Sequence, residues 1–281
     1  MSYKIVVDSC CELPDELKKD PRFEIVPLGI EVGDWRIQDD ETFNQAEFLR
    51  RVAECPECPR SSCPSPDRYK QSFDCDAEHI YVVTLSANLS GSHNSAVLGK
   101  NLYEEKHHDK KIHVVDSKSA SGGEAQIALK AMELEEKGLA FEEIVQQLEA
   151  FRDEMNTYFV LNNLETLRKN GRLTGVKALV ASTLNIKPVM GATEEGTIIQ
   201  LGQAIGLKKA LQKMADIVAR ETANPQKKCL MITHCNNLAK AESVRDMILA
   251  KAKFAEARIL DTAGISSMYA CLLYTSPSPR D

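Results

Sequence analysis

The chain has 281 residues, of which 43% are hydrophobic and 27% are charged, proportions that are typical of globular proteins. Its 35 Lys and Arg residues against 41 Asp and Glu residues give a formal net charge of −6, which argues against a general binder of nucleic acid or of anionic membranes. No run of about 18 apolar residues occurs, and a strand-like segment begins directly after the N-terminus. We therefore expect a soluble, cytoplasmic protein without stable membrane insertion.

The first half of the chain alternates short apolar runs with amphipathic segments. The runs lack polar alternation, as expected of strands that are buried on both faces of a parallel sheet. Asn44 and Ser65 are typical N-cap residues, and Phe43 and Phe48 have the spacing of a hydrophobic staple around Asn44. We predict strands at residues 4–7, 24–28, 80–85 and 112–115, and helices at residues 45–52, 92–105, 123–137 and 141–155, with a further helix that opens after Ser65.

The second half has a different pattern, in which the strands are more numerous than the helices. We predict strands at residues 158–161, 186–190, 197–200, 229–233 and 257–260, a hairpin turn at residues 191–196, and helices at residues 207–222 and 238–253. The predicted fold is therefore α/β with two domains. An N-terminal parallel α/β sandwich spans residues 1–155, and a C-terminal mixed α/β domain spans residues 156–270. A ligand is expected in the cleft between them.

The final segment, residues 271–281, resembles the translation of a sequencing-library adapter, residue for residue. We interpret it as an adapter-derived artefact and exclude it from the reasoning about the fold. The natural chain is then expected to differ after Ala270.

Three predicted strands of the first half run directly into loops that contain serine. Ser9 follows the first strand, residues 86–92 follow the third, and Ser117 and Ser119 follow the fourth. In open α/β sheets the carboxyl ends of the strands form the ligand-binding edge. Helices that open beside these hydroxyls point unpaired N–H groups toward that edge, which favours a carboxylate or a phosphate. The alternative is that each serine only caps a helix.

Catalytic and metal-binding motifs are weak or missing. The sequence contains no G-x-S-x-G elbow, no Walker A motif and no G-x-G-x-x-G fingerprint after a strand, so we predict no catalytic residue and no nucleotide cofactor. An enzymatic alternative is a serine-dependent transferase or hydrolase in which Ser90 is the nucleophile and His93 the base. Cys55 and Cys58 have zinc-ligand spacing, but no matching second pair follows, so we expect no metal site.

At the serine loops the sequence resembles the DegV family of bacterial two-domain fatty-acid-binding proteins. The resemblance spans nearly all of residues 3–270. It rests on six segments: 7–9 (VDS), 61–66 (SSCPSP), 89–92 (LSGS), 115–123 (VDSKSASGG), 164–173 (LETLRKNGRL) and 184–189 (LNIKPV).

This resemblance implies that a long-chain fatty acid lies between the two domains, as the bound ligand and in place of a cofactor. The residues that match the family's carboxylate-binding positions are Ser61, Ser62, Ser90, Gly91, Ser92 and Arg172. In characterised members the protein is a non-catalytic carrier, which presents the fatty acid to a separate ATP-dependent fatty acid kinase. The resemblance therefore implies that kinase as a partner.

Two positions depart from the family's pattern. Cys63 stands where the family commonly has Gln in the loop over the ligand. Some members also carry a His beside the carboxylate in their terminal strands. That position would follow Ala270, where the adapter-like segment takes the place of the natural residues.

Overall fold

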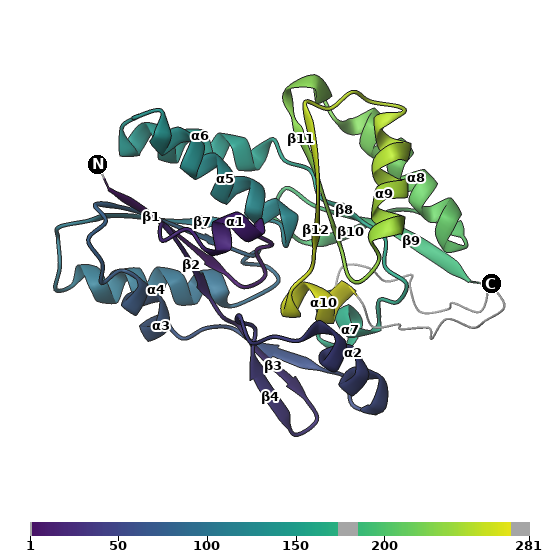
Figure 1. The fold of residues 1–281 in the computed structure, drawn as a ribbon, viewed down its shortest axis with the longest axis horizontal. Coiled ribbons are helices and arrows are strands. Elements are labelled where there is room, and N and C mark those ends of the chain that lie inside the picture. Colours follow the sequence, from purple (N-terminus) through teal and green to yellow (C-terminus); the bar gives the residue numbers. More distant parts are fainter. Residues whose placement is uncertain (1, 174–184, 271–281) are drawn as a thin grey trace.

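The computed structural model describes residues 2–173 and 185–270, and its first half is built on a four-stranded parallel sheet (Figure 1). The strand order is β2-β1-β6-β7, and every neighbouring pair is parallel. The strands are β1 (Tyr3–Asp8), β2 (Phe23–Val26), β6 (His79–Thr84) and β7 (Lys111–Asp116). All four predicted strands and their parallel arrangement are confirmed.

Helices cover both faces of this sheet, as the apolar runs predict. Side chains alternate along each strand, so Ile5 and Val7 face one layer while Val6 faces the other. One layer consists of α5 (Gly122–Glu136) and α6 (Phe141–Asp153), and the other of α3 (Pro66–Ser72) and α4 (Ser92–Glu104). The first half is thus a three-layer sandwich with a separate apolar core on each side of the sheet.

Local capping signals are confirmed where the sequence predicts them. Asn44 Oδ1 accepts the Glu47 N–H at 2.9 Å at the start of α2 (Gln45–Glu54), and the rings of Phe43 and Phe48 lie 5.5 Å apart. Ser65 Oγ accepts the Arg68 N–H at 3.2 Å, with Pro66 as the first residue of α3. These helices begin where they do because the caps satisfy otherwise unpaired N–H groups.

Several short elements of the first half were not predicted from the sequence. They are α1 (Asp15–Lys18) and a small antiparallel sheet of β3 (Gly29–Val32), β4 (Trp35–Gln38) and β5 (Arg60–Ser62). In the sheet β3 is central, and it pairs Ile30 with Ser61. The small sheet therefore fixes the position of the serine segment that follows Arg60.

Two more sheets are formed by the described residues of the second half. Strands β8 (Tyr158–Phe159), β9 (Ile186–Ala192) and β10 (Ile198–Ile205) are antiparallel, whereas β11 (Cys229–His234) and β12 (Glu256–Asp261) are parallel. The predicted hairpin joins β9 to β10. The remaining helices are α7 (Glu165–Lys169), α8 (Leu207–Glu221), the 3-10 helix η1 (Pro225–Lys227), α9 (Leu238–Leu249) and α10 (Gly264–Ala270).

Several predicted elements of this half have different ends, among them the strand predicted at residues 186–190, which continues to Ala192. The strand predicted at residues 158–161 stops at Phe159, and the strand predicted at 197–200 continues to Ile205 past an irregularity between Gln200 and Gly202. The helix predicted at 238–253 ends at Leu249. The domain boundary at residue 156 stays a prediction. Leu184 and residues 271–281, including the proposed adapter segment, lie outside the described residues.

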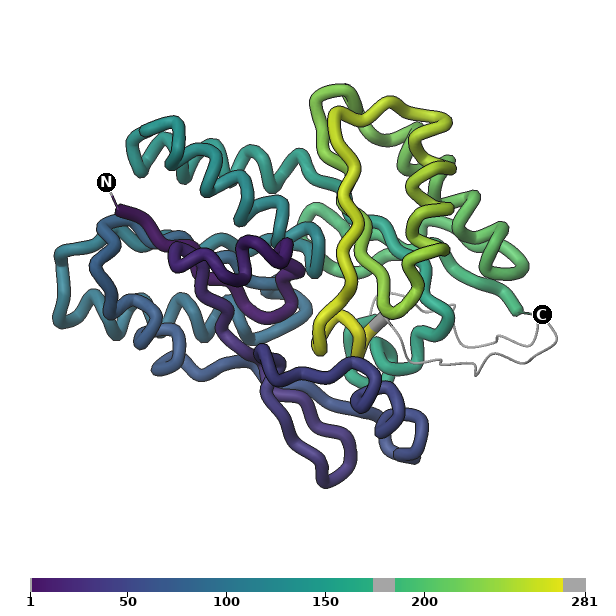
Figure 2. Tube along the Cα trace, in the orientation of Figure 1, coloured from purple at the N-terminus to yellow at the C-terminus, as the bar shows by residue number. Residues whose placement is uncertain are grey.

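The last described segment returns to the first half of the chain. Figure 2 shows its yellow trace beside purple and blue parts of the N-terminal region. Ile265 and Met268 of α10 share an apolar cluster with Cys10, Leu28 and Phe48. The two ends of the described chain therefore meet in one core, next to the site considered below.

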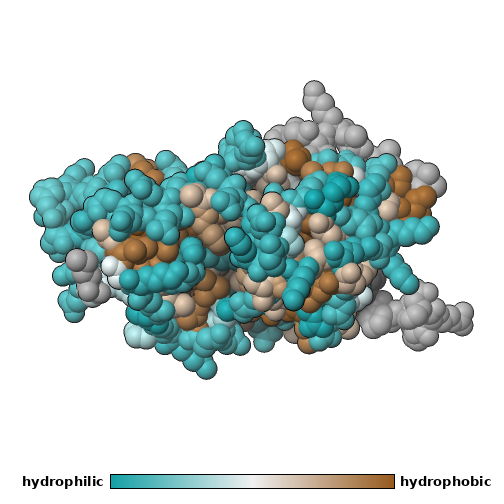
Figure 3. Space-filling model, turned by 90° about the horizontal axis from the view of Figure 1, so that it is seen from above, coloured by the Kyte–Doolittle hydropathy of each residue, from teal (hydrophilic) through white to brown (hydrophobic). Residues whose placement is uncertain are grey.

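The surface seen in Figure 3 is mostly hydrophilic, with hydrophobic residues in scattered patches. Apolar atoms contribute a large share of the surface of most folded proteins, so such patches are usual. Within the described ranges, every helix is too short or too polar to cross a bilayer.

Candidate ligand-binding site

The three serine-containing loops meet at one edge of the parallel sheet, as predicted. Strands β1, β6 and β7 are adjacent and parallel, so their carboxyl ends share that edge. The loops are also bonded to one another, because the Ser86 N–H donates to the Ser119 carbonyl at 2.8 Å. Ser9, Ser86 and Ser117 are buried, and the Ser9 hydroxyl accepts the Leu28 N–H at 3.0 Å. These three serines therefore stabilise the loops at this edge of the sheet and do not face the solvent.

A cavity of about 1260 Å³ lies beside this edge and takes its walls from both halves of the chain. Leu85, Leu89 and Ala120 contribute from the loops of the first half. The second half contributes aliphatic side chains of its strands and helices, including Leu211, Met214, Val218, Leu230 and Ile248. Such walls suit an apolar chain, with polar groups concentrated at particular points.

A smaller pocket of about 530 Å³ adjoins the cavity. Ser90, Gly91 and His93 line it from the first half, and Arg172 lines it from the second. Leu89 and Arg172 line both spaces, so the pocket and the cavity meet at these two residues. The smaller pocket thus forms the polar end of the site, and the large cavity forms its long, largely apolar end.

Arg172 is held in place without a counter-charge. Its Nε donates to the Leu89 carbonyl at 3.1 Å, and its guanidinium carbon lies 5.7 Å from the centroid of the Tyr269 ring. Within residues 2–173 and 185–270, no Asp or Glu carboxylate forms an ion pair with this side chain. A half-buried guanidinium of this kind favours an anionic guest, because charge-assisted hydrogen bonds offset the cost of removing the charge from water.

Ser61 meets a residue that the sequence did not indicate. Its Oγ lies 3.0 Å from the hydroxyl of Tyr269, which lines the large cavity from α10. Burial raises the pKa of Tyr269, so the phenol stays protonated and can donate a hydrogen bond. Ser62, the next residue of β5, is exposed, and neither Ser61 nor Ser62 lines the cavity or the smaller pocket. The alternation of side chains along a strand explains why only one of the two faces Tyr269.

Ser90 and Ser92 have different positions. The Ser92 N–H donates to Ser90 Oγ at 3.2 Å, so the single proton of the Ser90 hydroxyl can point toward the pocket. The Ser92 hydroxyl is fully buried and donates to Asp8 Oδ2 at 2.6 Å. Ser92 lines neither space, and its hydroxyl is occupied within the protein.

The geometry does not favour Ser90 as a nucleophile. His93 Nδ1 lies 3.4 Å from Thr84 Oγ1, and no hydrogen bond in the described part of the chain joins His93 to Ser90. Burial lowers the pKa of His93. A nucleophile of this type needs a base within hydrogen-bond reach, so the enzymatic alternative gains no support here.

Cys10 lines the large cavity, and Cys63 lies beside Gly91 of the smaller pocket. Over the described ranges, no group of three or more His, Cys, Asp or Glu side chains is arranged to hold a metal ion. Cys63 is exposed, and a Cβ added at Gly91 would lie 3.1 Å from its sulfur. The Cys63 thiol therefore lies directly against the Ser90–Gly91 turn.

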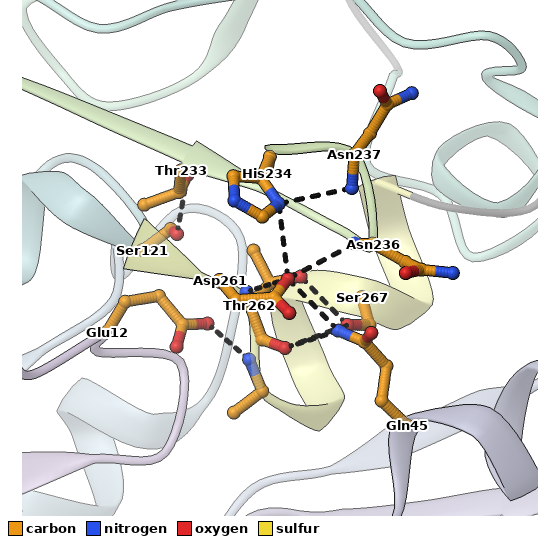
Figure 4. Close-up of polar contacts among 11 residues, drawn as sticks. Glu12, Gln45, Ser121, Thr233, His234, Asn236, Asn237, Asp261, Thr262 and Ser267 are labelled. Atoms are coloured by element: carbon orange, nitrogen blue, oxygen red, sulfur yellow. Dashed lines mark hydrogen bonds and ion pairs between the residues drawn. The ribbon is translucent and has the colours of Figure 1, made fainter. Parts of the chain in front are cut away.

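Figure 4 shows a polar seam where residues of the first half meet the ends of β11 and β12. Glu12 Oε1 accepts the Ala263 N–H at 2.9 Å, and Gln45 Nε2 donates to the Thr262 carbonyl at 2.8 Å. The Asp39 carboxylate accepts the N–H groups of Gly264 at 2.7 Å and Ile265 at 2.8 Å. This segment leads directly into α10, so the seam fixes the position of Tyr269.

A family model and a curated relative both match the chain over nearly its whole length. A protein-family model described as "Uncharacterised protein, DegV family" matches residues 2–270. A curated relative, the DegV domain-containing protein spr0652 of Streptococcus pneumoniae (strain ATCC BAA-255 / R6), is 37% identical over 273 residues and covers 96% of each chain.

Two solved structures resemble the whole described fold. A DegV family protein from Ruminococcus gnavus ATCC 29149, refined with vaccenic acid, is 54% identical with a TM-score of 0.93, and the match covers 96% of each chain. The Streptococcus pneumoniae Fatty Acid Kinase (Fak) B3 protein, loaded with linoleic acid, is 36% identical with a TM-score of 0.87 and the same 96% coverage of each chain.

Proposed function

Because the chain belongs to the DegV family, we propose that it binds one long-chain fatty acid between its two halves. The carboxylate lies in the smaller pocket, where Ser90, the Gly91 N–H and Arg172 bind it. Tyr269 lines the large cavity, and its hydroxyl is held by Ser61. The acyl chain extends into the cavity of about 1260 Å³.

The observation that carries this proposal is the position of Arg172. A guanidinium without a carboxylate partner among the described residues lines both the smaller polar pocket and the largely apolar cavity. A fatty acid has the matching form, with one charge at one end of an alkyl chain. At about 0.8 kcal/mol per buried methylene, a chain of roughly 14 methylenes contributes on the order of 11 kcal/mol before ordering costs.

We further propose that the protein is a cytoplasmic carrier and not an enzyme. The similar structure from Streptococcus pneumoniae is named a fatty acid kinase B3 protein, and the present sequence lacks nucleotide-binding motifs. The carrier presents the carboxylate to a separate kinase subunit, which transfers the γ-phosphoryl group of ATP to a carboxylate oxygen and releases ADP. The exposed turn at Gly91 leaves the head group accessible to such a partner.

The binding proposal is tested by comparing palmitate with hexadecanol, which has the same chain length and no charge. Delipidated wild-type protein should bind palmitate more tightly than hexadecanol. Arg172→Gln should weaken palmitate binding by about 10- to 100-fold, since a hydrogen bond to a charged group contributes roughly 1.5–3 kcal/mol.

The matched control is Arg168→Gln, which removes an exposed arginine that pairs with Glu165 on α7. It should leave both affinities unchanged. Equal affinity of the wild type for the acid and the alcohol would contradict the assignment of the head-group pocket.

The carrier role has a separate test. A fatty acid kinase catalytic subunit with ATP should form acyl phosphate, trapped as the hydroxamate, only when the loaded protein is added. Acyl phosphate formation by the protein alone would contradict its description as a non-catalytic carrier.

A further inference from the structure

A hydrogen-bonded chain of three fully buried polar side chains, Tyr69, Ser92 and Asp8, lies beneath the proposed head-group pocket. Tyr69 of α3, Ser92 at the start of α4 and Asp8 at the end of β1 are each 0% exposed. The Tyr69 and Ser92 hydroxyl oxygens lie 2.6 Å apart, and Ser92 Oγ lies 2.6 Å from Asp8 Oδ2. Three elements of the first half are thus joined by two short hydrogen bonds.

The direction of these bonds follows from the number of protons. A serine hydroxyl has one proton, and Ser92 donates it to the Asp8 carboxylate. The Ser92 oxygen therefore accepts the proton of Tyr69. The donors run from Tyr69 through Ser92 to Asp8, whose carboxyl oxygens also accept the N–H groups of Cys10 at 3.1 Å and Leu85 at 3.0 Å.

Each member of this chain is attached to a loop of the proposed site. Asp8 holds both ends of residues 85–92, through the Leu85 N–H and the Ser92 hydroxyl. Tyr69 lies one turn into α3, whose N-cap Ser65 ends residues 61–65. The Ser92 N–H in turn orients the Ser90 oxygen. The relative placement of Ser61 and Ser90 therefore depends on the three buried groups.

We propose that Tyr69, Ser92 and Asp8 are positioning residues, which set the two serine loops at the spacing that a carboxylate requires without contacting the ligand themselves. This inference rests on the proposed fatty-acid function. It assigns Ser92, a residue expected at the ligand, to the support of the pocket. Loss of one hydroxyl leaves a buried partner unsatisfied and lets the loops separate.

The test uses Tyr69→Phe and Ser92→Ala, each compared with a control that removes a similar hydroxyl elsewhere. Tyr81→Phe removes a buried hydroxyl that bonds Glu135 at 2.7 Å, and Ser72→Ala removes a buried hydroxyl of α3 that bonds Glu24 at 2.8 Å. For each protein the dissociation constants of palmitate and of hexadecanol and the midpoint of thermal unfolding are measured.

Tyr69→Phe and Ser92→Ala should each lose about five- to tenfold in palmitate affinity, while hexadecanol affinity changes less than about twofold. The controls should lower thermal stability without moving the ratio of the two affinities. Tyr69→Phe is the decisive variant, because it keeps the ring in the core beside Phe73.

The inference would be overturned if Tyr69→Phe bound palmitate as tightly as the wild type, or if it lost affinity for palmitate and hexadecanol by the same factor. Either result would leave the proposed function intact. A wild-type protein that binds neither ligand would instead refute the proposed function itself.

Discussion

At the scale of single residues, the serines of this site differ in where their protons go. Ser92 donates its proton inward to Asp8, whereas Ser90 Oγ accepts the Ser92 N–H and has its own proton available to the pocket. Two serines that are two positions apart in one turn therefore have opposite roles. The helical turn at Gly91 places the Ser92 hydroxyl in the protein interior and the Ser90 hydroxyl on the side of the smaller pocket.

Ser90→Ala should weaken palmitate binding by about 1–3 kcal/mol, because the carboxylate then lacks one hydrogen-bond donor. The dissociation constant from a displacement titration measures this loss. Ser243→Ala, an exposed serine on α9, is the control and should bind as the wild type does. Full palmitate affinity in Ser90→Ala would remove Ser90 from the site.

The sequence indicated part of this site and missed part of it. The pattern of serines after parallel strands locates Ser90 and Gly91, and the resemblance adds Arg172, which lines the same pocket. Tyr269 was missed because its partner Ser61 is 208 residues away, and no local pattern predicts a contact of that range. The buried position of Ser92 likewise depends on Asp8, which lies 84 residues earlier.

At the scale of elements, the placement of the two serine loops depends on how closely α3 and α4 approach. Gly99 of α4 faces the first turn of α3 without a side chain between them. A Cβ added there would lie 2.6 Å from the Pro66 carbonyl oxygen and 2.9 Å from Tyr69 Cβ. These are closer than the usual contact distances, and the carbonyl belongs to the backbone, so the helices themselves would have to move.

Gly99→Ala should therefore destabilise the protein by roughly 1–3 kcal/mol, even though alanine normally stabilises a helix interior. The free energy of unfolding in urea measures the effect. Asn101→Ala on the exposed side of α4 is the control and should be neutral or slightly stabilising. A stabilised Gly99→Ala would show that the helices separate without cost.

Elements with strong local signals were predicted well, and short ones were not. Buried apolar runs and N-caps located the parallel strands and helices α2 and α3, because those signals lie within a few residues. Strands β3, β4 and β5 have only three or four residues each, and their pairing is set by tertiary contacts. Helix α10 was missed for the same reason, since its packing partners lie at the opposite end of the chain.

At the scale of the whole molecule, buried acids join the two ends of the chain. Burial raises the pKa of Glu12 to about 8 and that of Asp39 to about 6. Glu12 accepts the N–H of Ala263, just before α10, and Asp39 accepts the N–H of Gly264, the first residue of α10. A carboxyl group whose pKa is raised on folding binds more protons in the folded state. Its contribution to stability is therefore present at low pH and is lost as the pH rises through the folded-state pKa.

Glu12→Gln should remove the part of this pH dependence that Glu12 causes, because the amide keeps the acceptor for the Ala263 N–H and cannot ionise. Between pH 4.5, the ordinary value for Glu, and pH 8, the wild type should lose stability relative to the variant, by on the order of 4 kcal/mol. Urea unfolding at several pH values measures the difference.

Glu16→Gln, an exposed neighbour on α1, is the control and should follow the wild type. Parallel stability curves for the wild type and Glu12→Gln would contradict the buried position of Glu12 in the polar seam.

The central claim is that one fatty acid occupies the cavity shared by the two halves, and its most direct test is mass spectrometry of the purified protein. Native spectra should show a mass increase equal to one long-chain fatty acid per chain, and solvent extraction should release that acid. Protein that carries no fatty acid after purification and takes up none when palmitate is added would contradict the claim.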